Sequence, residues 1–312
     1  MRTITIAICL LFCHVGLAAQ GDVIVLRVSG QAFYYPQYGS KPISMYPGLA
    51  LEKTGKVHCK GQGSAKLLYK GTTILVSGTK LRDVQELVKA AVSGSQMSFT
   101  GRFFNFVTES VKEGESQEKL KKHHGRYMSK TSGGIEGFAK DSLAIVPLAI
   151  ATGTLPAGTV IFKWRSAPGE GPYNFRLLKP EGRQVAQLFV RDTFVTLDLD
   201  ELAMDIFVEY EWSVTRDDSL KSVSMPFKIC PEKAKEVQSE ISKDPYFQSA
   251  DPEEQQLMLA ISLEEEECFY SANNTYIHLL ATNPDNVLLR RMYTTFLARR
   301  DMLPEANALI PR

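Results

Sequence analysis

Ile206-Phe207-Val208-Glu209-Tyr210-Glu211-Trp212-Ser213-Val214 is the stretch that decides the fold at the centre of this chain, because apolar and polar side chains alternate along it. Val160-Ile161-Phe162-Lys163-Trp164 alternates in the same way. Alternation at every second residue is the pattern of a strand with one buried face. Three further strand-like segments lie between these two, at residues 173–178, 185–190 and 194–199. Together they predict an antiparallel β-sandwich over residues 143–230.

The aromatic residues of these strands have a characteristic spacing. Phe162-x-Trp164 comes early, Tyr173 follows, and Tyr210-x-Trp212-x-Val214 comes late. This arrangement resembles the fibronectin type III or immunoglobulin-like class, and the resemblance implies that fold without implying a ligand. We therefore expect Trp164 and Trp212 in the core rather than on a sugar-binding surface.

Towards the C-terminus, four positions recur at a spacing of 34 residues, with small and large side chains in the same order. The pairs are Leu259 and Tyr293, Leu263 and Leu297, Ala272 and Ala306, and Tyr276 and Ile310. This period resembles the tetratricopeptide repeat, a helical hairpin whose stacked copies bind other proteins. The resemblance implies tetratricopeptide-like α-hairpins over residues 251–312. Asp251-Pro252-Glu253-Glu254 is a suitable helix start, with a capping side chain, Pro at the first position and acids in the first turn.

The repeat groove is where we expect a partner protein to bind. Six polar and aromatic residues at or near it are the candidate protein-binding residues: Tyr276, Asn283, Arg290, Arg291, Tyr293 and Arg300. Two repeats are fewer than an independent array needs, so the tail is expected to lean on the sandwich or to complete its stack on a partner. We also expect it to contribute little to the cores upstream.

The N-terminal end predicts export. Met1-Arg2 is followed by an apolar run from Ile4 to Val15 and then by small residues, so residues 1–20 are expected to be a signal peptide. The longest later apolar stretch, 143–151, contains a proline and is too short to cross a membrane. The sequence thus predicts a periplasmic or extracellular protein with no transmembrane segment.

Short strands separated by glycine turns follow the signal. The order Pro-Gly-x-x-Leu, Gly-x-Val, Gly-Ser-Ala-x-Leu and Gly-Thr-x-Ile-x-Val, within residues 23–81, resembles the FecR-type domain, a small β domain of bacterial envelope regulators. The predicted organisation is a FecR-like β domain at 21–83, a helical segment at 84–124, a linker at 125–142, the sandwich, a helical connector at 231–250 and the repeats. The predicted class is therefore a multidomain protein, mainly β with α.

Charge and cysteines narrow the functional classes. The formal charge is +1, or zero after loss of Arg2, so no basic field favours nucleic acid. Cys59, Cys230 and Cys268 remain after removal of the signal, which permits at most one internal disulfide.

No motif supports catalysis, a cofactor or a metal. His123-His124 are adjacent on a predicted helix and point apart, and the run Glu264–Glu267 is expected to solubilise an outer helix face. The sequence thus predicts a non-catalytic cell-envelope protein that acts in protein–protein interaction or scaffolding. The alternative is envelope signalling or glycan sensing through the FecR-like domain, and a hydrolase is the third class considered.

Overall fold

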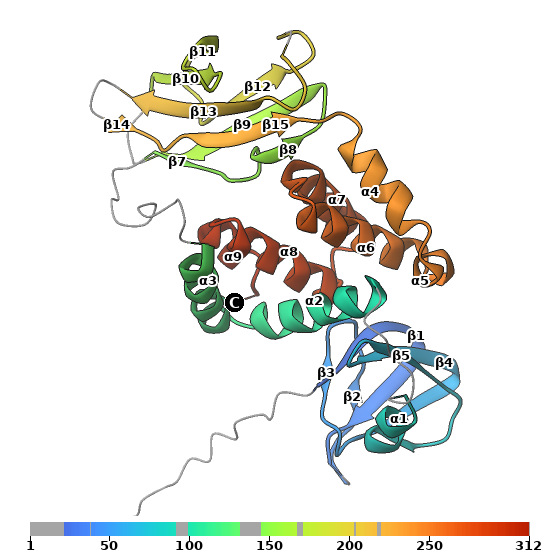
Figure 1. Ribbon diagram of the computed structural model, residues 1–312. Coiled ribbons are helices and arrows are strands. Elements are labelled where there is room, and N and C mark those ends of the chain that lie inside the picture. The colour runs from blue at the N-terminus through green and yellow to red at the C-terminus, as the bar shows by residue number, and fades with distance from the viewer. Residues whose placement is uncertain are drawn as a thin grey trace, which may run out of the picture.

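The computed structural model describes residues 22–37, 39–91, 99–131, 145–166, 171–202, 204–216 and 220–311. Figure 1 shows two β units at opposite ends of the molecule, with helices between them. The predicted combination of antiparallel sheets and helices in several units is confirmed. The signal peptide expected at 1–20 lies outside the described residues.

The first β unit comprises residues 22–91. Its elements are β1 (Val23–Tyr35), β2 (Ile43–Ser44), β3 (Ala50–Leu51), β4 (Lys56–Tyr69), β5 (Thr72–Ser77), β6 (Arg82–Asp83) and α1 (Val84–Ala91). The strands form one antiparallel sheet in the order β2-β1-β4-β5, with β3 on β1 and β6 on β4. Both long strands carry irregularities in their register, which bend the sheet.

This sheet buries side chains on both faces. Val23 and Val25 of β1 pack into a core that includes Val84 and Val88 of α1. Ile24 and Leu26, between and beyond them, point the opposite way because successive strand residues alternate. They pack against helices from elsewhere in the chain, so the sheet has an inner core of its own and a second face that needs a cover.

The helical unit lies between the two β units (Figure 1). It consists of α2 (Phe99–Glu113), α3 (Gln117–Thr131), α4 (Lys233–Ile241), α5 (Pro245–Ser249), α6 (Pro252–Glu265), α7 (Phe269–Thr282), α8 (Val287–Arg299) and α9 (Leu303–Ala308). The predicted segment 84–124 is thereby divided, since α1 belongs to the first β unit while α2 and α3 lie against α8. The linker expected at 125–142 begins too early, because α3 continues to Thr131. A single glycine inside a helix, here Gly125, costs only about 1 kcal/mol and did not end it. The rest of that segment lies outside the described residues.

One hydrophobic core joins the helical unit to the first sheet. Phe103 and Val107 of α2 share this core with Met258 of α6, Met292 of α8 and Leu68 of β4. The expectation that the tail contributes little to the cores upstream is therefore wrong. Two hairpins leave an apolar face uncovered, and α2 and α3 of the same chain cover it.

The C-terminal hairpins themselves follow the sequence pattern. Antiparallel neighbours α6/α7 and α8/α9 are joined by short turns, and Ala272 and Ala306 are both fully buried. Asp251 caps α6 by accepting a hydrogen bond from the Glu254 backbone at 3.2 Å, with Pro252 at the first position. The predicted helix start is confirmed.

The sandwich comprises residues 145–230. Its strands are β7 (Val146–Pro147), β8 (Gly153–Leu155), β9 (Thr159–Arg165), β10 (Tyr173–Leu178), β11 (Gln184–Val190), β12 (Phe194–Asp198), β13 (Glu209–Arg216), β14 (Leu220–Lys221) and β15 (Met225–Ile229). One sheet has the order β11-β10-β13-β15-β8, with β14 on β13, and the other has the order β12-β9-β7. All pairings are antiparallel except β15 with β8.

Aromatic side chains fill the space between these two sheets. Trp212 is fully buried, meets Phe162 edge-on at 5.5 Å between ring centres and donates its Nε1–H to the Ala151 carbonyl at 2.8 Å. Trp164 is buried beside Tyr173 at 5.6 Å. The predicted core positions of both tryptophans are confirmed.

Candidate functional site

The two candidate tyrosines lie in the helical core. Tyr276 is fully buried and stacks on Tyr293 at 5.8 Å and against Phe296 at 5.2 Å. Burial raises the pKa of Tyr276 well above its usual value and that of Tyr293 to about 12. The Tyr293 hydroxyl donates to Asn273 Oδ1 at 2.9 Å. Tyr276 therefore has no exposed surface to offer a partner.

Asn283 and Arg290 donate hydrogen bonds to backbone carbonyls at the turn between α7 and α8. The Asn283 Nδ2 group donates to the Leu279 carbonyl at 3.4 Å, and the Arg290 guanidinium donates to the Pro284 carbonyl at 2.6 Å. The Leu279 carbonyl also accepts the backbone N–H of Asn283 at 3.0 Å, so the side chain adds a second contact at the end of α7. These two residues stabilise a helix end.

Arg291 and Arg300 connect the helical unit to the β units. Arg291 Nη1 donates to the Gly48 carbonyl of the first β unit at 2.9 Å. Arg300 Nε donates to the Ala149 carbonyl at the start of the sandwich at 3.3 Å, and its guanidinium lies 3.6 Å from the centre of the Phe269 ring. The six candidate residues thus do not converge on one groove, and several of them hold the molecule together.

A buried ion pair was missed from the sequence. Arg299 binds both carboxylate oxygens of Glu264, at 2.6 and 3.0 Å, and lies 4.5 Å from the centre of the Phe106 ring. Burial by itself lowers the pKa of Arg299, but the charge of Glu264 and its hydrogen bond raise it above the usual value. Glu264 is thus inside, contrary to the expectation of a solubilising run, because it lies one helical turn beyond the buried Ile261.

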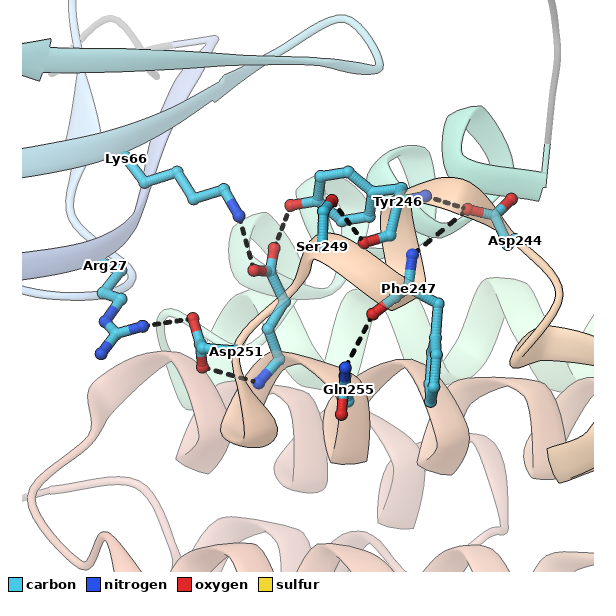
Figure 2. A network of polar contacts seen from close by, with 9 residues as sticks. Arg27, Lys66, Asp244, Tyr246, Phe247, Ser249, Asp251 and Gln255 are labelled. Atoms are coloured by element: carbon cyan, nitrogen blue, oxygen red, sulfur yellow. Dashed lines mark hydrogen bonds and ion pairs between the residues drawn. The ribbon is translucent and has the colours of Figure 1, made fainter.

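A polar network joins the first β unit to the start of α6 (Figure 2). Arg27 of β1 pairs with Asp251 at 2.5 Å, and Lys66 of β4 pairs with Glu254 at 2.6 Å. The Tyr246 hydroxyl also donates to Glu254, while the Lys66 ammonium lies 4.8 Å from the centre of the Tyr246 ring. Burial, followed by the hydrogen bond to Glu254, raises the pKa of Tyr246. The sheet and the helices are therefore fixed by charged contacts as well as by the shared core.

A cavity of about 300 Å³ lies where the sandwich meets α7. Arg300 is the one candidate residue that lines it. The other charged lining residues are Lys228, Glu209 and Glu267, and Phe227 and Phe269 are aromatic. Lys228 and Glu209 are 3.7 Å apart and both well exposed. The charges of this lining balance, so the cavity has no electrostatic preference that would identify a ligand.

The outer edge of the sandwich carries exposed apolar side chains. β11 ends its sheet, and within the described residues it pairs with β10 and with no other strand. Leu188 is 36% exposed and Phe189 is 71% exposed. Leu188 lies opposite the buried Phe175, and Phe189 lies opposite Asn174, so the two side chains are on different faces of the sheet. The strand Gln184–Val190 contains no charged residue and no proline.

Clusters of metal-ligating side chains and membrane-spanning helices are two further features that could define a site. Among the described residues, no group of three or more His, Cys, Asp and Glu side chains could hold a metal ion. Over the same part of the chain, no helix combines the length and apolarity that a membrane span requires. The thiols of Cys59, Cys230 and Cys268 are all unbridged.

Comparisons with known proteins include a weak structural match. No family model and no curated protein matches the sequence. One solved structure that matches is described as a Fn3-like protein from Clostridium thermocellum. It is 18% identical, the match covers 25% of this chain and 86% of that chain, and the TM-score is 0.20. The sandwich fold is accordingly defined by its own strand pairing.

Proposed function

We propose that this protein is a non-catalytic interaction protein that binds a partner protein along the open edge of β11. The observation that carries the proposal is the uncharged edge strand with exposed Leu188 and Phe189. Natural edge strands are normally protected by charge, proline, bulges or a covering element, because their unpaired backbone groups invite another strand. A partner segment added to β11 would satisfy those groups and cover both side chains.

The local register supports this use of the strand. The pairing of β10 with β11 is regular from Ala186 to Val190, and its one irregularity falls at the opposite end, between Leu177 and Leu178. A regular strand presents its outward backbone groups at the spacing that a second strand matches. The helical unit then acts as a support that holds the sandwich and the first β unit apart.

The proposal also includes the family resemblance of two parts of the chain and the location of the protein. The glycine-punctuated strands support a FecR-like first β unit, and the 34-residue echo supports tetratricopeptide-like hairpins. The apolar run after Arg2 supports export to the periplasm or beyond the cell. The protein would thus work in the cell envelope, where other envelope proteins are its partners.

Site-specific crosslinking tests the proposal. A photoreactive amino acid at position 189, activated in an envelope extract, is expected to join the protein to a defined partner. The same amino acid at position 277, where Ile277 is exposed on α7, is the matched control and should give no such product. Leu188→Lys should abolish the product by placing a charge at the edge. A product that forms equally well from position 277 would rule out β11 as the binding edge.

A further inference from the structure

A groove of about 350 Å³ lies where the first sheet meets the turn between α5 and α6. Its floor is set by the register of the strands. Arg27 lies opposite Lys66, and Ser29 lies opposite Ser64 on the same two strands. Directly opposed residues on neighbouring strands point to the same face and have Cβ atoms roughly 5 Å apart. Two cations and two hydroxyls therefore share one small area of the sheet.

Three other residues complete the lining. Leu75 of β5 lies opposite Lys66 on the far side of β4 and forms an exposed apolar border. Ser249 and Asp251 come from the helical unit. Figure 2 shows Arg27 and Lys66 reaching from the sheet toward this turn. A molecule in the groove would thus contact both units at once.

The groove has more hydrogen-bond donors than the protein uses. A guanidinium has five N–H groups, and Asp251 is the ion-pair partner of Arg27 within the described chain. The Arg27 side chain is 57% exposed. In that same part of the structure, the hydroxyls of Ser29 and Ser64 have no hydrogen-bond partner. The Lys66 ammonium has three donors, one of which meets Glu254.

The lining of the groove holds more cations than anions. Arg27 and Lys66 contribute two positive charges, whereas Asp251 contributes one negative charge. Two carboxylates outside the lining offset these cations in part: Glu254, which pairs with Lys66 and has a side chain only 11% exposed, and Glu253, which interacts with Arg27. An arginine fork beside an ammonium and hydroxyl donors is the arrangement that binds planar or tetrahedral oxyanions.

We propose that this groove binds an oxyanion of the phosphate or sulfate type, either as the inorganic ion or as the acidic group of a larger polar molecule. Arg27 would bind two of its oxygens, Lys66 a third, and the two serine hydroxyls would donate the remaining hydrogen bonds. Asp251 competes with the ligand for Arg27. The site is separate from the β11 edge. A failure to bind anions would therefore leave the partner-binding proposal unaffected, and the reverse also holds.

Titration of the full chain tests the site. Inorganic phosphate, inorganic sulfate, glucose 6-phosphate and glucose are added in turn, and binding is followed by calorimetry and by backbone amide shifts of β1 and β4. At least one anion should bind saturably, while glucose should not bind. Tighter binding of glucose 6-phosphate than of phosphate would assign the site to an esterified group, and the reverse order would assign it to the inorganic ion.

Four variants locate the binding. Arg27→Gln is expected to weaken it by about tenfold or more, since a hydrogen-bonded charge pair is lost. Ser29→Ala combined with Ser64→Ala leaves both ion pairs intact and should weaken it about fivefold. Asp251→Asn keeps the helix cap, because Asn caps as well as Asp, and should tighten binding about threefold by removing a competing charge. Lys60→Gln, on β4 outside the groove, is the control and should leave affinity within about twofold.

Two results would overturn the proposal. One is the absence of saturable binding by any of the three anions up to about 10 mM, which corresponds to an interaction too weak to matter. The other is binding that Lys60→Gln weakens as much as Arg27→Gln does, because a diffuse attraction to surface charge would then explain it. If Arg27→Gln fails to fold, the double serine variant and Asp251→Asn still decide the matter, since each has its own expected direction.

Discussion

The sandwich and the first sheet use their faces in opposite ways. Trp212, Phe162 and Phe175 of the sandwich point into a space enclosed by its own two sheets. In contrast, β1 sends Val23 inward and Ile24 outward into the core of the helical unit. Two sheets that enclose a core between them can fold without other elements. A single sheet with two apolar faces also needs another element to bury its second face.

The cores therefore divide the molecule into the sandwich and everything else. The contacts between these two parts include Leu148 and Ile150 of the sandwich, which pack against the helical core, and Tyr270 of α7, which packs against the sandwich core.

The tryptophans make this division measurable, since the chain has only two and both are in the sandwich. Their fluorescence reports the sandwich, and the circular dichroism of the helices reports the helical unit. Two separate signals can therefore follow the two parts through the same unfolding experiment.

Deletion of residues 251–312 should have the largest effect. It removes the helices that cover Ile24, Leu26 and Leu68, so the first β unit and α2 should lose their fixed structure. The tryptophan signal of the sandwich should remain. Amide spectra of the truncated chain check both expectations. A first sheet that keeps its dispersed amide signals would show that its second face needs no cover.

Trp212→Ala should cost the sandwich about 3 to 5 kcal/mol, because a large side chain leaves a cavity in a closed core. Trp164 continues to report the sandwich in this variant. In a urea titration, the midpoint of the helical circular dichroism signal should not change. Glu209→Ala, on an exposed side chain of the same strand, is the control and should change stability by less than about 0.5 kcal/mol. Equal shifts of both transitions would mean that the two parts unfold together.

Glu264→Gln should destabilise the helical unit by about 3 kcal/mol, since the buried Arg299 loses its counter-charge. Here the helical signal should shift and the tryptophan signal should not. Glu267→Gln removes the same charge from an exposed position and should have little effect. An unchanged midpoint for Glu264→Gln would indicate that water reaches the ion pair.

The sequence predicted those features that local pattern determines. Alternation predicted a strand over 206–214 with Trp212 buried, and Asp251-Pro252 predicted a helix start. The strand begins only at Glu209, because the preceding Ile206 and Phe207 are exposed in a turn where Phe207 has a positive φ of 64°. It did not predict that Phe103 meets Met258, because contacts between segments far apart in the chain leave no periodic signal in either. Glu264 was hidden in a run of four glutamates, although its position one turn after Ile261 was a usable signal.

The candidate sites show the same limit. The strand containing Phe189 was expected from its residues, but its place at the end of a sheet depends on the order of strands in space. The lack of charge over residues 184–190 was the available signal. For the groove, Arg27 and Lys66 are brought together only by the register of β1 and β4.

The smallest expected effect is on the alkylation rate of Cys268, which lies near the boundary between the sandwich and the helical unit. Cys268, at the start of α7, is buried, and this burial raises the pKa of its thiol to about 11. A raised thiol pKa means that the thiol stays protonated and slow to react at pH 8, and becomes a thiolate only near pH 11. Alkylation followed by peptide mass spectrometry over this pH range measures it. Rapid labelling of Cys268 at pH 8 would show that the boundary opens in the native protein.

The central claim is that the sandwich is a self-contained unit whose β11 edge binds the partner. The most direct measurement is competition by the fragment 145–230 against the full chain for the partner crosslinked from position 189. The account predicts that the fragment folds cooperatively and prevents the crosslink, and that the same fragment carrying Phe189→Lys folds but does not compete. A folded fragment that leaves the crosslink unchanged would contradict the claim.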